Sequence, residues 1–338
     1  MDLAQQNILV TGATGFIGSH VVERFRNEKH AAVRALVRNP AKAGRLAELG
    51  VELIQGDLAD SIAVERAVRG CTLVVHSAAQ VSSVPGREAF EQSNVAGTES
   101  LLRAAAAAGV SRFVHLSSIA VFGLAMSGEI TDESPRLSSG DAYCDTKLDA
   151  EEVVWKCSRR GRMTCVILRP SCVYGPGSTH WSVIPVKRLK KGKMFLVGGG
   201  RGMLNYVYIE NLVDAILIAA EHERAAGEAF IVNDGATTWR DYFGAYARMT
   251  EKNHIPSVPL WAARVWVHYR NFVAAVKRES MRVPQNSLGF LVGTAVYRQS
   301  QIENRLGHRS RISLEDGLQR TEAWLQTAGF LEPAKSGK

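Results

Sequence analysis

Short apolar runs recur along the first half of the chain, and stretches whose apolar residues have helical spacing separate them. The runs are typical of buried strands and cover residues 7–10, 31–37, 51–54, 72–76, 112–116 and 163–168. Single glycines stand where a helix is expected to end before the next strand, at Gly50, Gly70, Gly109 and Gly161. Strands that alternate with helices predict an α/β fold, a doubly wound parallel sheet of the Rossmann type.

A glycine-rich turn follows the first strand and precedes a helix expected over residues 19–27. Its sequence is Thr-Gly-Ala-Thr-Gly-Phe-Ile-Gly, with three glycines spaced three apart. Such a turn lets the backbone approach a pyrophosphate, and the helix N-terminus aims free N–H groups at the negative charge. The alternative is a structural turn without a ligand. The residues expected to hold a dinucleotide are Gly12, Thr14, Gly15, Phe16, Ile17 and Gly18.

The end of the second strand indicates which dinucleotide is bound. The segment 35–40 lacks a carboxylate that could accept hydrogen bonds from an adenosine ribose 2′-hydroxyl, and Arg38 stands there instead. A guanidinium can pair with a 2′-phosphate, so we expect NADP(H) in preference to NAD(H), with Arg34 or Lys42 as helpers. A solvated surface arginine is the alternative, and it leaves NAD(H) open.

Later segments carry side chains suited to the same cofactor. Asp57, before Leu58, can accept from an adenine amino group, or the carboxylates here cap the next helix. Ala78 and Ala79 are small enough for a ribose to lie against the backbone. Asn94 opens a long helical segment, where its amide acts as a cap or as a cofactor contact.

The candidate chemistry lies after the fifth strand, where Ser117 and Ser118 place hydroxyls at the carboxyl edge of the sheet. Tyr143 and Lys147 follow at a spacing of four, about one turn apart on one face of a helix. An ammonium and a nicotinamide cation favour the phenolate and lower the phenol pKa from roughly 10. The pair is a candidate proton donor or acceptor, although this spacing also arises by chance on exposed helices.

The composition is ordinary for a soluble chain, with 46% hydrophobic and 22% charged residues among 338. The sequence shows no secretory leader, no run of eighteen apolar residues and no metal-type spacing among its five cysteines. We therefore expect a cytoplasmic protein with reduced thiols and no metal. The net charge of +8 gathers between Glu251 and Arg320, where 11 Lys or Arg oppose 5 Asp or Glu. Without a nucleic-acid-binding motif, this favours an anionic ligand or a membrane surface and no nucleic acid.

Together the motifs resemble those of the extended short-chain dehydrogenase/reductases of the NAD-dependent epimerase/dehydratase type, from about residue 7 to residue 329. The matching segments are 11–18, 56–58, 94–98, 117–123, 143–147 and 169–177. The resemblance implies that Tyr143 is the general acid/base and that Lys147 lowers its pKa and holds the nicotinamide ribose. Ser118, rather than Ser117, would bind the reacting oxygen. The implied cofactor contacts further include Asn94, Pro170 and Ser171.

The resemblance also implies an organisation for the chain. Residues 1–177 and about 203–234 would form the dinucleotide-binding domain. Residues 178–202 and 235–330 would form a smaller C-terminal substrate-binding lobe, and residues 331–338 a disordered tail. Members of this family often pair as homodimers through two helices, one of which would contain Tyr143.

The substrate class depends on a short segment before a helix expected from residue 209. Nucleotide-sugar enzymes of the family place there an arginine that holds the pyrophosphate, and Leu204 occupies the position in this chain. The pattern Tyr206-x-Tyr208-x-Glu-Asn resembles the 3β-hydroxysteroid and sterol dehydrogenase branch instead. Arg188 or Arg201 could replace the missing arginine, so a nucleotide sugar stays open.

A basic amphipathic helix is expected over residues 261–278. Its apolar stripe comprises Trp261, Val265, Tyr269, Phe272 and Val276, flanked by Trp266 and Val273. Arg270, Lys277 and Arg278 project from the other side. The helix either covers the substrate pocket or makes a peripheral contact with an anionic membrane surface.

The sequence thus predicts an NADP(H)-dependent oxidoreductase that interconverts an alcohol and a ketone on an apolar, steroid-like or other hydroxy/oxo substrate. The rival is a nucleotide-sugar epimerase or dehydratase that recycles its nicotinamide cofactor. A nucleotide-sensing binding module is the alternative outside enzymes, and the serine, tyrosine and lysine set counts against it.

Overall fold

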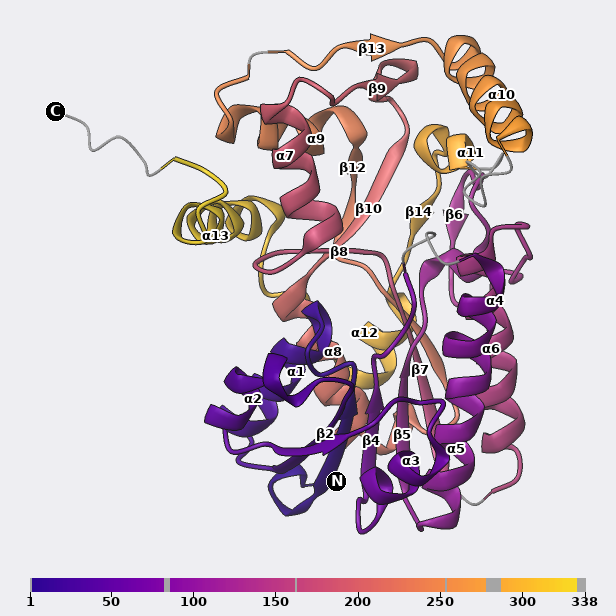
Figure 1. Cartoon of the computed structure of the whole chain (residues 1–338), viewed down its shortest axis with the longest axis vertical. Coiled ribbons are helices and arrows are strands. Elements are labelled where there is room, and N and C mark those ends of the chain that lie inside the picture. Colours follow the sequence, from indigo (N-terminus) through magenta and orange to yellow (C-terminus); the bar gives the residue numbers. More distant parts are fainter. Residues whose placement is uncertain (1, 82–85, 162, 253, 278–286, 333–338) are drawn as a thin grey trace, which may run out of the picture.

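A computed structural model describes the chain except for residues 1, 82–85, 162, 253, 278–286 and 333–338 (Figure 1). Its large sheet has seven parallel strands in the order β3-β2-β1-β4-β5-β7-β11. The strands are β1 (Asn7–Thr11), β2 (Ala32–Val37), β3 (Glu52–Gln55), β4 (Leu73–His76), β5 (Arg112–Leu116), β7 (Thr164–Pro170) and β11 (Ala229–Val232). The six predicted strands are confirmed, and β11 is an additional strand at one edge.

Alternate residues of each strand pack on opposite faces of this sheet, which explains the unbroken apolar runs. Ile8 and Val10 of β1 face one helical layer, whereas Leu9 between them faces the other. The first layer contains α1 (Phe16–Asn27), α2 (Gly44–Glu48) and α8 (Ile209–Glu221). The second contains α3 (Ser61–Val68), α5 (Gly97–Ala107) and α6 (Ala142–Ser158), with the short α4 (Arg87–Phe90) beside α6. The doubly wound prediction is therefore confirmed.

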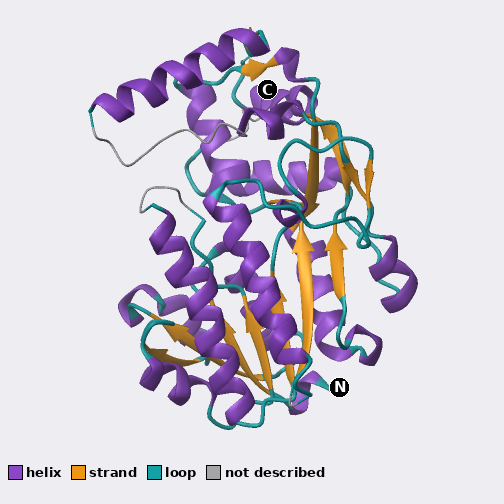
Figure 2. Ribbon diagram, turned by 90° about the vertical axis from the view of Figure 1, so that its right-hand side faces the viewer, coloured by secondary structure: helices purple, strands orange, loops and turns teal. Residues whose placement is uncertain are grey.

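A smaller lobe lies beyond the carboxyl ends of the large sheet, toward which the strand arrows point (Figures 1 and 2). Its central sheet joins β8 (Cys172–Tyr174), β10 (Met203–Tyr208) and β12 (Gly235–Thr238). Two short pairs join β9 (Leu196–Val197) to β13 (Ser257–Val258) and β6 (Glu129–Ile130) to β14 (Val296–Tyr297). The remaining helices are α7 (Ile184–Lys190), α9 (Trp239–Met249), α10 (Leu260–Val276), α11 (Ser287–Val292), α12 (Ser300–Leu306) and α13 (Leu314–Thr327).

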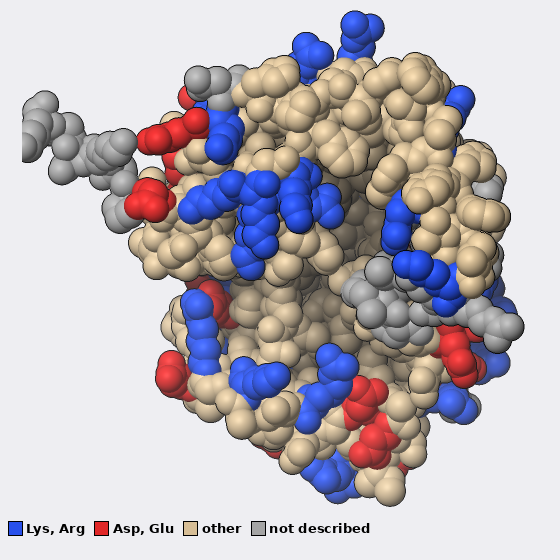
Figure 3. Space-filling view, turned by 45° about the horizontal axis from the view of Figure 1, so that its top comes forward, with Lys and Arg blue, Asp and Glu red and all other residues tan. Residues whose placement is uncertain are grey.

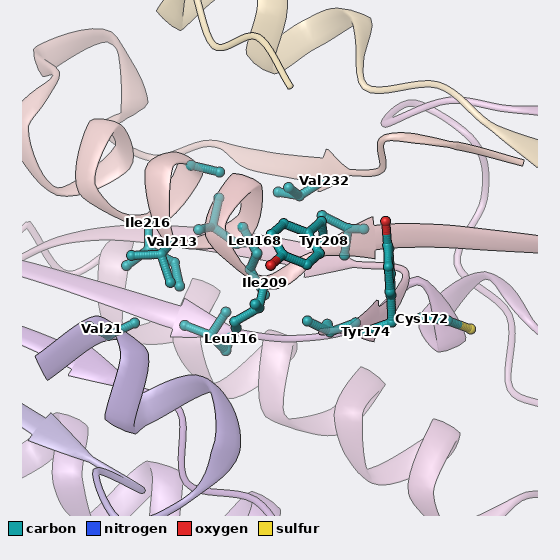
Figure 4. Packing of buried hydrophobic residues seen from close by; sticks show 14 of the residues in the cluster. Val21, Leu116, Leu168, Cys172, Tyr174, Tyr208, Ile209, Val213, Ile216 and Val232 are labelled. Carbon is teal, nitrogen blue, oxygen red and sulfur yellow. The ribbon is translucent and has the colours of Figure 1, made fainter. Parts of the chain in front are cut away.

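One continuous core joins the two parts (Figure 4). Ile209 of α8 lies between Leu116 of the large sheet and the aromatic rings of Tyr174 and Tyr208, and Val213 lies beside Ile216 of the same helix. Both tyrosine side chains are fully buried. The carboxyl edge of the large sheet and the strands β8 and β10 thus share one buried core.

The predicted division of the chain into a dinucleotide-binding domain and a substrate-binding lobe stays a prediction. Contacts cross the predicted boundaries. Helix α12, placed in the smaller lobe by sequence, packs on β11 of the large sheet. Leu331, the first residue of the predicted tail, is buried, so the tail does not begin there. Residues 333–338 of that tail lie outside the described residues. Among the described helices, none has the length and apolar character needed to span a bilayer.

Candidate active site

The glycine turn lies where the chain order of the sheet reverses, between neighbouring β1 and β4, which is where ligands bind in doubly wound folds. Gly12 has φ +70°, and a Cβ there would lie 2.7 Å from the backbone nitrogen of Ala78. A Cβ at Gly18 would overlap the carbonyl oxygen of Gly12. The turn therefore needs glycine at both positions, and it leaves bare backbone facing the sheet edge.

Helix α1 begins at Phe16, three residues earlier than predicted, and its N-cap Gly15 supplies no side-chain capping bond. The N–H groups of Phe16, Ile17 and Gly18 therefore lie in the first helical turn, where no earlier helical carbonyl is available to them. Uncapped N–H groups beside a glycine cradle fit the pyrophosphate of a dinucleotide. Thr14 lies in the turn directly before this helix.

The predicted 2′-phosphate site lies at the ends of β2 and β3. The Arg38 side chain is 82% exposed, and its Nε lies 3.9 Å from an Asp57 carboxylate oxygen. Both residues line a surface hollow together with Gln55, Gly56, Asp60 and Arg66. The helper role of Arg34 is wrong, because its guanidinium pairs with Glu52 and donates to backbone carbonyls of the α3 end. Lys42 is exposed in the turn after β2.

The sequence left two roles open for the carboxylates after β3, a helix cap and an adenine contact. Asp60 is the N-cap of α3 and accepts from the Ala63 N–H at 3.0 Å. Asp57 is not the cap; among the described residues its carboxylate accepts a local bond from the Ala59 N–H at 3.1 Å, and its side chain is half exposed. Leu58 is buried, and a Cβ on Gly97 would lie 3.1 Å from its own. Asp57 therefore keeps a carboxylate oxygen for a ligand.

Asn94 is buried in a π-helical segment between α4 and α5, so the cap reading is wrong. Its amide oxygen accepts from the Gln80 N–H at 2.7 Å, and its amide nitrogen donates to the Gln80 carbonyl and to Thr146 Oγ1, each at 3.2 Å. It thereby ties the segment after β4, which contains Ala78 and Ala79, to α6. Such π segments are frequent at functional sites.

Ser118 and Tyr143 meet at the carboxyl end of β5. Ser118 caps the 3-10 turn at residues 119–122 by accepting from the Ala120 N–H at 3.2 Å, and its hydroxyl lies near enough to the Tyr143 phenol to favour the ionised form of that phenol. Burial raises the pKa of Tyr143 to about 12, and the Ser118 hydroxyl opposes that rise. The protein's own groups therefore raise the Tyr143 pKa, whereas the sequence predicted that it is lowered. They hold Tyr143 as a neutral phenol.

Lys147 is 4% exposed and lies one turn after Tyr143 on α6. Its Nζ donates to the carbonyl oxygen of Leu116 at 2.7 Å, so the ammonium is held at the end of β5. Burial lowers the pKa of Lys147 to about 8, whereas the charge of Glu151 raises it. The structure thus gathers Ser118, Tyr143 and Lys147 at one sheet edge.

A buried ionic network behind these residues was not predicted. Glu151 is fully buried, accepts from Ser117 Oγ at 2.6 Å and receives a two-pronged contact from Arg169 at 2.9 and 2.8 Å. Arg136 adds a third contact at 3.1 Å. Ser117 therefore faces away from Tyr143, which agrees with the choice of Ser118. The spacing of four from Tyr143 through Lys147 to Glu151 was the available signal.

Pro170 and Ser171 follow the same edge at the end of β7. The Ser171 N–H donates to the Val232 carbonyl at 3.1 Å, and its buried hydroxyl has no hydrogen-bond partner among the described residues. Leu204 is fully buried in the core, where its side chain contributes to packing. Arg188 and Arg201 are exposed on the smaller lobe.

The predicted helix over 261–278 is α10, with Arg278 outside the described residues. Its apolar stripe is exposed, with fractions of 70% at Trp261, 62% at Val265, 63% at Tyr269, 68% at Phe272 and 68% at Val276. The small residues Ala263 and Ala274 are buried with Val267 instead. The apolar stripe therefore faces outward instead of packing against the rest of the described chain.

Comparison with known proteins identifies the family. The family model described as NAD dependent epimerase/dehydratase family matches residues 8–233. The 4-hydroxy-2-methyl-3-oxo-4-farnesyl-3,4-dihydroquinoline-1-oxide ketoreductase of Stigmatella aurantiaca is 28% identical, over 91% of this chain and 93% of its own length. The sterol-4-alpha-carboxylate 3-dehydrogenase of Candida albicans is 27% identical, over 96% of this chain and 99% of its own.

A solved structure agrees with the same assignment. The dTDP-glucose 4,6-dehydratase of Streptomyces venezuelae, crystallised with NAD, superposes with a TM-score of 0.78 at 27% identity. The match covers 97% of this chain and 100% of that chain. The resemblance drawn from the motifs is confirmed, because the family model spans well over half of the sequence. The chain belongs to the NAD dependent epimerase/dehydratase family and is a nicotinamide-dependent oxidoreductase acting on CH–OH groups.

Proposed function

We propose that the protein interconverts an alcohol and a ketone on an apolar hydroxy/oxo substrate of the steroid-like kind, with Tyr143 as the general acid/base. The observation that carries the proposal is the gathering of Ser118, Tyr143 and Lys147 at the carboxyl edge of the sheet, with the Lys147 ammonium fixed to the Leu116 carbonyl. The ketoreductase and the sterol dehydrogenase among its relatives support this substrate class.

When bound, the nicotinamide cofactor supplies or accepts a hydride. Ser118 donates to the substrate oxygen and orients it toward Tyr143. A phenol with a pKa of about 12 stays protonated at neutral pH and can give its proton to a developing alkoxide. Lys147, anchored to the Leu116 carbonyl, supplies positive charge one helical turn away, where it stabilises the phenolate left by that transfer.

The reaction is tested with Tyr143→Phe and a 3-oxosteroid. Removing the proton donor should lower kcat by about 10²- to 10⁴-fold, while NADP(H) still raises the unfolding temperature. The adjacent serines provide a matched pair: Ser118→Ala should lower kcat, and Ser117→Ala, whose hydroxyl points to Glu151, should retain it. Turnover by Tyr143→Phe at the wild-type rate would refute the mechanism.

We propose NADP(H) as the preferred cofactor, with Arg38 pairing with the 2′-phosphate. The exposed guanidinium at the end of β2 supports this choice. Wild-type protein should then show a larger thermal shift with NADP(H) than with NAD(H), and Arg38→Ala should lose the difference. Arg34→Ala, which removes a guanidinium toward the other end of the same strand, where it pairs with Glu52, is the control. A larger shift with NAD(H) would overturn the role of Arg38.

A nucleotide-sugar epimerase or dehydratase is the second candidate. Lys and Arg side chains gather beside the hollow in the middle of the face shown in Figure 3, and Arg188 and Arg201 are among the exposed residues of the smaller lobe. Anionic diphosphates would suit such a surface. Cofactor that stays bound through purification, with a thermal shift from dTDP-glucose, would favour this candidate. Free cofactor exchange favours the dehydrogenase.

The proposal includes two partners besides the substrate. One is a second copy of the chain, paired through helices that include α6, which light scattering of the purified protein would detect as a dimer. The other is a membrane surface, for which α10 supplies the contact residues.

A further inference from the structure

Helix α10 concentrates exposed apolar surface on one element. Six of the ten large apolar side chains that are exposed in the described part of the chain lie on it: the five of the apolar stripe and Trp266, which is 52% exposed. Single exposed apolar residues are common, whereas a contiguous group marks a binding surface.

The register of α10 shows that this exposure is built into the helix. Ala263, Val267 and Ala274 are its buried residues and form one face. At 100° per residue, the centre of the apolar stripe, near Val265 and Phe272, lies opposite that face. The helix packs on the protein through mostly small side chains and presents its large aromatic side chains outward. Had these large side chains faced the protein, their burial would have stabilised the fold. Their outward placement instead marks this side of the helix as a binding surface.

A second element extends the apolar surface. Phe195, 51% exposed, directly precedes β9. Strand β9 pairs in parallel with β13, and β13 ends two residues before α10 begins. The Phe195 ring therefore comes from the same end of the smaller lobe as Trp261. Two chain segments far apart in sequence thus contribute aromatic side chains to one end of the molecule.

The charges around this surface have one sign. The sequence has no Asp or Glu between Glu251 and Glu279, and none between Glu152 and Glu210. Arg264 and Lys277 are exposed on α10, and Lys190, Lys191 and Lys193 are exposed just before Phe195. On the helix, Arg264 and Lys277 lie on opposite flanks of the apolar stripe, between it and the protein. Figure 3 shows the top of the molecule as largely uncharged surface with Lys and Arg at its margins.

We propose that α10 and Phe195 dock the protein peripherally on an anionic phospholipid bilayer, with the helix lying in the plane of the interface. The apolar stripe then enters the boundary between headgroups and acyl chains, and the flanking cations reach the anionic headgroups. A second copy of the chain is a poorer occupant, because an isologous contact would bring these cations against each other. The docking does not depend on the proposed reaction.

The test is co-sedimentation of the full-length protein with vesicles at low salt. Vesicles of phosphatidylcholine with phosphatidylglycerol should bind the wild type, and pure phosphatidylcholine should bind it less. Trp261→Ser/Phe272→Ser should weaken binding by at least about tenfold, because each buried aromatic side chain contributes about 1.5–3 kcal/mol. Ile62→Ser is the matched control, since Ile62 on α3 is 70% exposed, as Trp261 is.

The variants must first share the wild-type unfolding temperature, which excludes loss of binding through misfolding. Arg264→Gln/Lys277→Gln should weaken binding to anionic vesicles and reduce its dependence on salt. A wild type that does not sediment with anionic vesicles would overturn the proposal, as would equal binding by the Trp261→Ser/Phe272→Ser variant. It would also fail if light scattering showed self-association that this variant abolishes, because the occupant would then be a second copy.

Discussion

Helices α6 and α10 have the same length, seventeen residues, and each departs from the ordinary burial rule in the opposite direction. Helix α6 buries polar and charged side chains: Asp145, Thr146, Lys147 and Glu151. Helix α10 exposes large apolar ones. Buried polar groups and exposed apolar patches are the informative exceptions to that rule.

The difference lies in where each helix finds its partners. On α6, Lys147 donates to the Leu116 carbonyl, Asp145 accepts from the Ser139 N–H at 2.9 Å, and Glu151 is bonded by three residues. Each buried charge is thus satisfied inside the protein, as burial requires. The apolar stripe of α10 has no such partner among the described residues. The exceptions on α6 support a reaction site, and those on α10 support a docking surface.

The largest test of this contrast is Glu151→Ala. It leaves Arg169, itself 4% exposed, buried without its carboxylate partner, so we expect a loss of about 3–5 kcal/mol in the free energy of unfolding, measured by urea denaturation. Glu152→Ala is the neighbouring control. Glu152 also pairs with Arg136, but its side chain is 43% exposed, so its loss should cost less than about 1 kcal/mol. If both variants lost the same free energy of unfolding, the buried charges of α6 would not depend on their partners inside the protein.

A smaller effect should appear on acidification, because Lys147 lies near two buried histidines. Burial and then the Lys147 charge lower the pKa of His76 to about 3, and that of His115 well below its ordinary value of 6.5. Above the pKa of the unfolded state, about 6.5, such a histidine is neutral in both states; below it, the unfolded state takes up a proton that the folded state does not. The free energy of unfolding should therefore fall below pH 6.5, by up to about 1.4 kcal/mol per pH unit for each histidine.

His115→Leu isolates one of the two contributions, because the ring nitrogens of His115 have no hydrogen-bond partner among the described residues. Urea denaturation at pH 6.5 and pH 5 should show this variant losing about 2 kcal/mol less than the wild type. His268→Leu, at an exposed position on α10, should keep the wild-type loss. An unchanged loss in His115→Leu would show that His115 does not titrate with unfolding.

The sequence predicted what depends on local pattern. Strands buried on both faces give unbroken apolar runs, so six strands of the large sheet were recognised. The glycine turn, Ser118, Tyr143 and Lys147 follow from spacing along short segments. The two-residue strands β9 and β13 carry too little pattern to be recognised.

Other features depend on contacts between distant segments. The partners of Glu151 come from three places in the chain, at Ser117, Arg136 and Arg169, and no spacing rule joins them. Arg34, which was predicted to help bind the 2′-phosphate, is a second example. Its position in the sequence did not reveal that it pairs with Glu52. Helical periodicity located the apolar stripe of α10 but did not show which side faces the protein.

The smallest expected effect tests that orientation directly. Phe272→Ser should change the free energy of unfolding by less than about 0.5 kcal/mol, because the ring is 68% exposed and packs on no core. Val267→Ser, on the buried face of the same helix, should cost about 1.5–3 kcal/mol. Both are measured by urea denaturation without lipid at two protein concentrations. A cost for Phe272→Ser as large as that for Val267→Ser would show that the apolar stripe is already covered in solution. If that cost also rose with protein concentration, the cover would be another copy of the chain, and α10 would resemble α6 in finding its partners within the protein.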